Sequence, residues 1–99
     1  MFTLPKKSYK IILLYNCDIE LGEFQLFALK FFQFLYRLGG KNITINLIGE
    51  GKLTYSIKNQ ETAQFVEIKL DISPKAINKF IDFINLDQNL IRHYTLKTS

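Results

Sequence analysis

The stretch GEGKLTYSIK, residues Gly49–Lys58, lies between two segments in which apolar and polar residues alternate. Residues 43–47, ITINL, precede it, and residues 64–72, QFVEIKLDI, follow a short polar segment after it. Alternation with a period of two is typical of a strand that has one solvent-facing side. The sequence therefore predicts a hairpin whose first strand runs through this stretch, with a polar turn over residues 59–62. The two glycines predict a bend or bulge within that strand.

Two helices and two further strands are predicted around this hairpin. Residues 9–15, YKIILLY, are apolar on both sides, as expected of a strand in the middle of a sheet. Residues 20–38 carry apolar side chains at helical spacing, with acids near the start and a double glycine after the end. A Ser-Pro pair predicts the start of a second helix that ends near Asn85, and residues 90–96 predict a last strand.

The order strand, helix, strand, strand, helix, strand is that of the ferredoxin-like split βαβ plan, an α+β fold. On this plan two helices cover one face of a four-stranded antiparallel sheet, and the first and third strands are central. A chain of 99 residues is expected to form a single domain, residues 1–99, with one modest core. Residues 1–8 have no period and are predicted to form a flexible arm.

Composition narrows the class of protein. With 47% hydrophobic residues, nine Phe and five Tyr, the chain is typical of a globular protein. Its most apolar run, residues 26–38, is interrupted by charged and polar side chains, so neither a membrane span nor a secretory signal is predicted. The formal net charge of +4 weakly favours an anionic partner such as nucleic acid. Abundant Lys, Ile, Asn and Phe with little Ala is a bias typical of an AT-rich genome, such as that of a plastid.

Residues for catalysis or metal binding are sparse. His93 is the only histidine and Cys17 the only cysteine, too few for a zinc site or a catalytic triad. An acylphosphatase-like enzyme of the same plan would need an arginine near a phosphate loop, whereas residues 16–23 hold acids and no basic residue. We therefore expect no enzyme activity, no cofactor and no small-molecule substrate. His93 is interpreted as a packed or partly exposed strand residue, and Cys17 as structural or neutral.

Binding through the open face of the sheet is the better interpretation. On the predicted register that face shows a mixture of apolar, acidic and basic side chains, namely Lys10, Ile12, Leu14, Phe65, Glu67, Lys69, Asp71, Arg92 and Tyr94. This mixture suits a protein partner beside an RNA, and scattered exposed apolar residues are the simpler alternative. Residues 64–72 lack the aromatic pattern of an RNA-recognition motif, so we expect Lys and Arg to contact the RNA backbone.

The stretch quoted above also resembles the signature of a known family, that of bacterial-type small-subunit ribosomal protein six (bS6). The matching residues are Gly49, Lys52, Leu53, Thr54, Tyr55, Ser56, Ile57 and Lys58. Gly51 stands where the family usually has a basic residue, Thr54 where it has Ala or Ser, and Cys17 where Pro is frequent. The likeness extends over about residues 9–97, because the double glycine after the first helix and the tail segment LDQNLIRHYTLK also match.

The resemblance implies a structural component of the small ribosomal subunit. Such a protein would bind the central domain of the small-subunit ribosomal RNA together with small-subunit ribosomal protein eighteen. The RNA contacts implied are Arg92 and Lys58 first, then Lys10, Lys52 and Tyr94, while Lys6 and Lys7 are added on charge alone. The residues predicted to face the protein partner are Ile12, Leu14, Phe65 and Lys69.

The expected location is the chloroplast ribosome, with the bacterial cytoplasm and the mitochondrion as alternatives. A second hypothesis comes from another class of protein. In it the chain is a ferredoxin-like regulatory or ligand-binding module that homodimerises through its sheet. A specific homodimer that ignores RNA would favour this second hypothesis.

Overall fold

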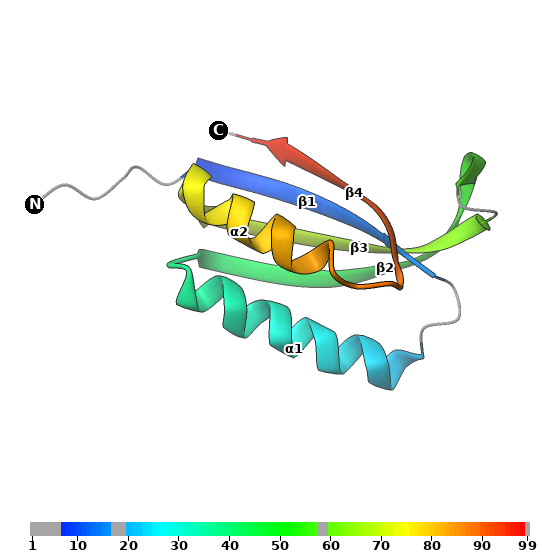
Figure 1. Ribbon diagram of the computed structural model, residues 1–99, viewed down its shortest axis with the longest axis horizontal. Coiled ribbons are helices and arrows are strands. Elements are labelled where there is room, and N and C mark those ends of the chain that lie inside the picture. The colour runs from blue at the N-terminus through cyan, green and yellow to red at the C-terminus, as the bar shows by residue number, and fades with distance from the viewer. Residues whose placement is uncertain (1–6, 17–19, 58–59, 99) are drawn as a thin grey trace, which may run out of the picture.

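The computed structural model describes residues 7–16, 20–57 and 60–98. They form six elements in the predicted order, namely β1 (Lys7–Tyr15), α1 (Leu21–Arg37), β2 (Lys41–Ile57), β3 (Gln60–Ile72), α2 (Pro74–Ile84) and β4 (Leu90–Lys97). The strands make one antiparallel sheet in the order β2-β3-β1-β4, so β1 and β3 are central. Both helices pack on the same side of this sheet (Figure 1). The predicted ferredoxin-like fold is confirmed.

Two predicted boundaries are wrong, and in both cases a strand is longer than its alternation suggests. β1 begins at Lys7, so Lys7 and Ser8 do not belong to a flexible arm. The Ser8 carbonyl accepts a hydrogen bond from the Thr98 N–H at 2.8 Å. β3 begins at Gln60, so residues 60–62 pair with β2 instead of forming the predicted turn. Backbone hydrogen bonds to the neighbouring strand hold these polar residues in an extended conformation. Their sequence has no apolar alternation that would have predicted it. The remainder of the arm, Cys17 and residues 58–59 lie outside the described residues.

The signals that predicted the helix ends correspond to hydrogen bonds in the structure. At the end of α1, the Gly40 N–H donates to the Leu35 carbonyl at 2.9 Å. At the start of α2, the Ser73 Oγ accepts a hydrogen bond from the Ala76 N–H at 3.3 Å, with Pro74 as the first helical residue. Each bond occupies a backbone group that has no partner within the helix itself.

The main core lies between the sheet and the two helices. Ile11 in β1 and Ile68 in β3 are fully buried, and both point toward the helices. Phe31 of α1 and Phe80 of α2 cover them, with ring centroids 5.5 Å apart in an edge-on arrangement. Burying a side chain of this size stabilises a fold by about 1.5–3 kcal/mol. Of the eighteen buried hydrophobic residues in the described part of the chain, fourteen belong to this layer, so we expect it to supply most of the stability of the domain.

The outer side of α1 is unusually apolar for an exposed surface. Leu26, Leu29 and Phe32, which the helical spacing places outside the core stripe, are all exposed. The Phe32 ring stacks with that of Tyr36, with centroids 6.4 Å apart. Within the described residues, no helix is both long enough and apolar enough to cross a membrane.

Candidate nucleic-acid and protein interface

The face of the sheet opposite the helices carries the predicted binding residues. Ile12 of β1 is paired with Glu67 of β3 on one side and with Tyr94 of β4 on the other. Leu14 is likewise paired with Arg92. Because directly opposed residues in neighbouring strands point to the same side of a sheet, these side chains share one face. The predicted register of the open face is confirmed.

The far part of the β2–β3 hairpin bends out of line with the rest of the sheet (Figure 1). The pairing of β2 with β3 shifts between Leu47 and Gly49, and Gly49 has a φ of 122°, where a side chain would be strained. Gly51 then lies over the ring of Phe65, so that a Cβ there would come within 3.0 Å of Cε1. The bulge predicted at the two glycines is confirmed. A long basic residue at position 51 would have to displace the Phe65 ring.

The bent hairpin encloses a second, smaller hydrophobic cluster on the open face. Its buried members are Leu14, Ile57, Ala63 and Ile91, against which Ile12, Leu53 and Phe65 pack. Leu14, which was predicted to face a partner, is only 3% exposed in this cluster. Its contact with a partner stays a prediction. The apolar residues of this face are not scattered, so the simpler alternative is wrong.

A hollow of about 310 Å³ opens beside this cluster. Apolar side chains line it together with one lysine and two tyrosines, namely Leu14, Leu53, Ile57, Phe65, Lys52, Tyr55 and Tyr94. Tyr55 is 68% exposed and Tyr94 45%, so both rings are available to a partner. The structure brings the predicted Lys52 and Tyr94 together and adds Tyr55 as a candidate contact. The signal for Tyr55 was its two-residue spacing from Leu53 and Ile57, which predicts that all three share one side of β2.

An ion-pair network occupies the middle of the open face. The Lys10 Nζ lies 3.2 Å from Glu67 Oε2, and the Lys69 Nζ lies 3.6 Å from Oε1 of the same carboxylate. The hydrogen bond from Lys10 holds the pKa of Glu67 below its ordinary value; burial opposes this shift, and the charges of both lysines add to it. Lys10 is therefore engaged within the chain. Lys69 has the more exposed side chain and is the better placed of the two for a partner.

The predicted RNA contacts do not all lie together. Arg92 is exposed on β4 and pairs with Leu14, which lines the hollow. Lys52 belongs to the hollow itself, so these two positive charges border the same part of the face. Lys7 lies at the other end of the sheet, where it pairs with the last residue of β3. Lys6 and Lys58 are outside the described residues.

His93 lies on the helix side of the sheet and not on the open face. It pairs with the fully buried Leu13, and its Nδ1 is buried without a hydrogen-bond partner in the described part of the chain. The interpretation of His93 as a packed strand residue is confirmed. Among the described residues, no group of three or more His, Cys, Asp or Glu side chains is placed to hold a metal ion.

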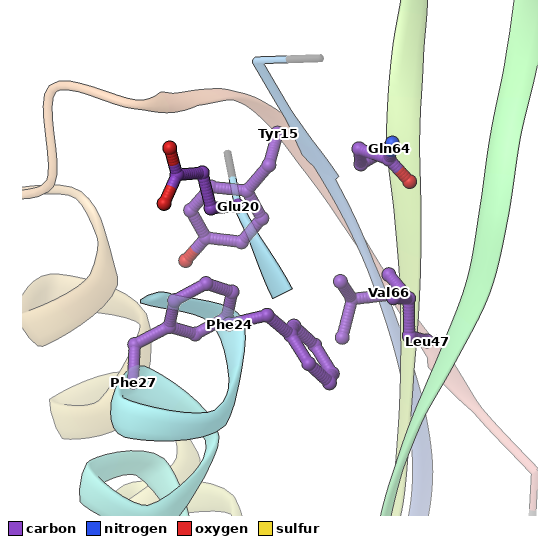
Figure 2. Close-up of a pocket in the computed structure, with 7 residues that line it drawn as sticks. All are labelled: Tyr15, Glu20, Phe24, Phe27, Leu47, Gln64 and Val66. Atoms are coloured by element: carbon purple, nitrogen blue, oxygen red, sulfur yellow. The ribbon is translucent and has the colours of Figure 1, made fainter. Parts of the chain in front are cut away.

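A separate cavity of about 160 Å³ lies where the start of α1 meets the sheet (Figure 2). It is lined by Tyr15, Glu20, Phe24, Phe27, Leu47, Gln64 and Val66. The Tyr15 ring stacks on Phe27 with centroids 4.8 Å apart, and its buried hydroxyl has no hydrogen-bond partner within the described residues. Burial, and to a lesser extent the charge of Asp87, raise the pKa of this phenol.

These observations define a ferredoxin-like protein with a helix-covered core and a mixed apolar and basic face on the other side of its sheet. A family model described as ribosomal protein S6 matches residues 8–97. The chain therefore belongs to the ribosomal protein S6 family of the small ribosomal subunit.

Two curated relatives agree with this assignment. The small ribosomal subunit protein bS6c of Trieres chinensis is 26% identical over 91% of this chain and 94% of its own length. The protein of the same name from Porphyra purpurea is 26% identical over 90% of this chain and 80% of its own length. The chain is thus a plastid-type member of the family, and the predicted location on the chloroplast ribosome is confirmed.

Solved structures agree with the fold. The crystal structure of 30S ribosomal protein S6 from Thermotoga maritima has a TM-score of 0.84 at 17% identity, covering 94% of this chain and 88% of that one. A putative PII-like signalling protein from Thermus thermophilus has a TM-score of 0.54, also at 17% identity, covering 99% of this chain and 91% of that one. The same architecture thus occurs in a ribosomal protein and in a putative signalling protein, so the fold alone does not decide between the two hypotheses.

Proposed function

We propose that the chain is a structural constituent of the small ribosomal subunit that binds the central domain of the small-subunit ribosomal RNA together with small-subunit ribosomal protein eighteen. The observation that carries the proposal is the hollow on the open face, which combines an apolar floor, two exposed tyrosines and a bordering pair of positive charges. The role involves binding and positioning only, without turnover or a cofactor.

The apolar part of the open face suits the protein partner. Tyr55 and Tyr94 expose large rings beside the half-buried Ile12 and Phe65. Protein interfaces are enriched in aromatic residues at their centres and have a polar rim. The exposed Lys69 lies on the same face, in the middle of the sheet. In this proposal it belongs to the polar rim around the aromatic centre of the interface. In this proposal Leu14 supports the surface from below.

The basic residues at the border of the hollow suit the RNA. Arg92 and Lys52 are exposed, and neither is engaged in an ion pair found among the described residues. Contacts from Arg and Lys to phosphates fix the position of a protein on RNA without reading its sequence. Lys10 is a weaker candidate because Glu67 holds it. Lys58 stays a candidate because of the resemblance to the family signature, and Lys6 because of its charge.

The first test is sedimentation of a native organelle lysate through sucrose gradients at low and then high salt, with this chain followed by mass spectrometry. We expect it to travel with the small ribosomal subunit at low salt. Because binding to phosphates releases counterions, rising salt should strip the protein off. A chain that stays with the free proteins at both salt concentrations would contradict the proposal.

Two matched pairs of variants test the role of the open face. Arg92→Ala should weaken binding to central-domain RNA in the presence of ribosomal protein eighteen, without changing the melting temperature. Lys30→Ala removes an exposed charge from the helix side and should leave binding unchanged. Tyr94→Ala should weaken the complex with ribosomal protein eighteen, whereas Tyr36→Ala, an exposed tyrosine on α1, should not. Equal effects within either pair would contradict the assignment of this face.

The regulatory module remains the competing function and has a distinct signature. A regulatory module of this fold would form a specific homodimer through its sheet and would bind no ribosomal RNA. Analytical ultracentrifugation of the purified chain, alone and with RNA, separates the two functions. A stable dimer that RNA does not disturb would favour the module.

A further inference from the structure

Charge is distributed unevenly along the molecule, which measures 49 Å in its longest direction. At one end β1 and β2 begin, β4 ends, α1 ends and α2 begins, as the left side of Figure 1 shows. Each of these five termini carries a basic residue, and together they form what we call the basic end, namely Lys7, Arg37, Lys41, Lys75 and Lys97. Lys7 is half-buried and the other four are exposed.

Acidic residues gather at the opposite end. Glu20, Glu23, Glu50, Glu61 and Asp87 lie at the start of α1, in the hairpin and after α2. At the basic end the only acid among the described residues is Asp71. Its two carboxylate oxygens accept hydrogen bonds from Ser8 Oγ at 2.6 Å and from Asn42 Nδ2 at 2.8 Å. Among the described residues, the five positive charges of the basic end are therefore accompanied by one negative charge, that of Asp71, whose carboxylate is hydrogen-bonded to Ser8 and Asn42.

The sheet fixes how these charges are spaced. Lys41 pairs with Asp71, Lys7 with Ile72, and Lys97 with Tyr9, so the three lysines stand on three strands at the same end of the sheet. Adjacent strands lie about 4.8 Å apart, and the four strands therefore span about 14 Å. Arg37 and Lys75 extend the group into the helix layer. Lys7 and Lys97 are paired with residues of the helix side and Lys41 with a residue of the open side, so the charges surround the end of the sheet. An end surface of this width can meet successive phosphates of one backbone.

We propose that the basic end is a second site for the phosphate backbone of RNA, separate from the open-face surface around Arg92 and Lys52. This inference rests on the proposed ribosomal function, which supplies the RNA, and adds that the protein holds two RNA segments at its two ends. A phosphate backbone suits this surface better than a protein does, because lysine is depleted in protein interfaces and frequent at phosphate contacts. Contacts of this kind fix position and do not read bases.

The test compares two double variants that remove the same charge. Lys41→Gln with Lys75→Gln alters the basic end, and Lys30→Gln with Lys79→Gln alters exposed lysines elsewhere on the helices. Affinity for transcribed central-domain RNA, with ribosomal protein eighteen present, is measured across a range of KCl concentrations. Each lost phosphate contact lowers the slope of log K against log salt by about 0.7–0.9. The basic-end pair should therefore lower the slope by about 1.5 and weaken binding about tenfold at low salt, while the control pair changes neither.

Footprinting of the RNA then separates the two ends. The basic-end pair should lose protection of one RNA segment, and Arg92→Gln should lose protection of a different one. Several outcomes would overturn the second site, namely equal weakening by both double variants, an unchanged footprint, or weakening only of the RNA-free complex with ribosomal protein eighteen. In each of these cases binding that still depends on Arg92 leaves the proposed function standing. Wild-type protein that binds no RNA at all would overturn both.

Discussion

Both faces of the sheet bury apolar residues, yet they are covered in different ways. On the helix side, Ile11 and Phe80 are fully buried between the sheet and the two helices. On the open side, Leu14 and Ile57 are covered only by a bent hairpin, and Phe65 stays half-buried beside a hollow. This difference indicates that the two faces have different roles. One face carries the main core, and the other carries the surface that we propose meets a partner.

This difference has an energetic consequence for substitutions. A change on the helix side should lower the free energy of unfolding of the whole domain. A change on the open side should loosen the hairpin locally and weaken binding, with a smaller effect on global stability. Unfolding measurements on matched variants test this difference between the two faces.

The largest effect is expected for Phe80→Ala. Phe80 is fully buried, and its ring packs edge-on against Phe31. Loss of the ring leaves a cavity, and substitutions of this kind cost about 3–5 kcal/mol. Because small domains are stable by only about 5–15 kcal/mol, urea unfolding should show a large drop in midpoint. Tyr36→Ala on the exposed side of α1 is the control and should change stability by less than about 0.5 kcal/mol. A loss below about 1 kcal/mol for Phe80→Ala would show that the helix layer is not the main core.

A smaller and more local effect is expected for Ile57→Ala. Ile57 belongs to the small cluster under the hairpin, which has fewer neighbours to lose and more freedom to collapse. We expect a cost of about 2 kcal/mol, at the low end of the range for such truncations. Hydrogen exchange should speed up for amides near the end of β2 and the start of β3, while amides of β1 stay protected. Global destabilisation as large as that of Phe80→Ala would mean that the two faces form one cooperative core.

The sequence predicted the helix side better than the open side, for a physical reason. Phe24, Phe27, Phe31 and Leu35 recur at helical spacing, and periodicity reports directly which side of a helix is buried. Strand alternation likewise predicted the order of the elements and the residues that share the open face. These features depend on neighbours close in sequence.

The features that the sequence did not predict depend on contacts distant in sequence. Leu14 has the alternation of an exposed residue, and only the fold of the hairpin over it buries the side chain. Ile91 joins the same cluster because the pairing of β1 with β4 shifts after Leu14. Lys7 and Gln60 belong to strands through ladder hydrogen bonds that no apolar pattern announces. The separation of the basic end from the hollow also follows from topology alone.

The helix side contains one polar group whose cost can be measured, the buried hydroxyl of Tyr15. Its pKa is raised by burial, so the folded state keeps the proton at a pH where the unfolded state has lost it. Below about pH 10, the ordinary value for tyrosine, this difference contributes nothing to pH dependence. Above it, the free energy of unfolding falls by up to about 1.4 kcal/mol per pH unit.

Tyr15→Phe should remove this alkaline decline in the free energy of unfolding. Near neutral pH the substitution should leave stability unchanged or raise it, because an unpaired buried group is lost. Parallel pH profiles for the two proteins between pH 8 and 11, the range around the ordinary tyrosine value, would contradict the assignment.

The smallest effect is expected on the open side, for Glu67→Gln. The pKa of Glu67 is lowered chiefly by the hydrogen bond from Lys10, so its contribution to stability is present above the ordinary pKa of glutamic acid, about 4.3, and is lost as pH falls through the folded value. At pH 7 the loss should stay below about 1 kcal/mol, because Lys10 and Lys69 are partly exposed and screened by solvent. At pH 2, well below about 4.3, wild type and variant should be equally stable.

The Glu67→Gln variant should also bind RNA more tightly at low salt, since it releases two lysines on the proposed binding face. The control Glu61→Gln, an exposed residue at the hairpin end, should change stability at pH 7 by less than about 0.5 kcal/mol. A stability difference for Glu67→Gln that does not change with pH, or weaker RNA binding, would mean that this carboxylate supports the open face by packing and not by charge.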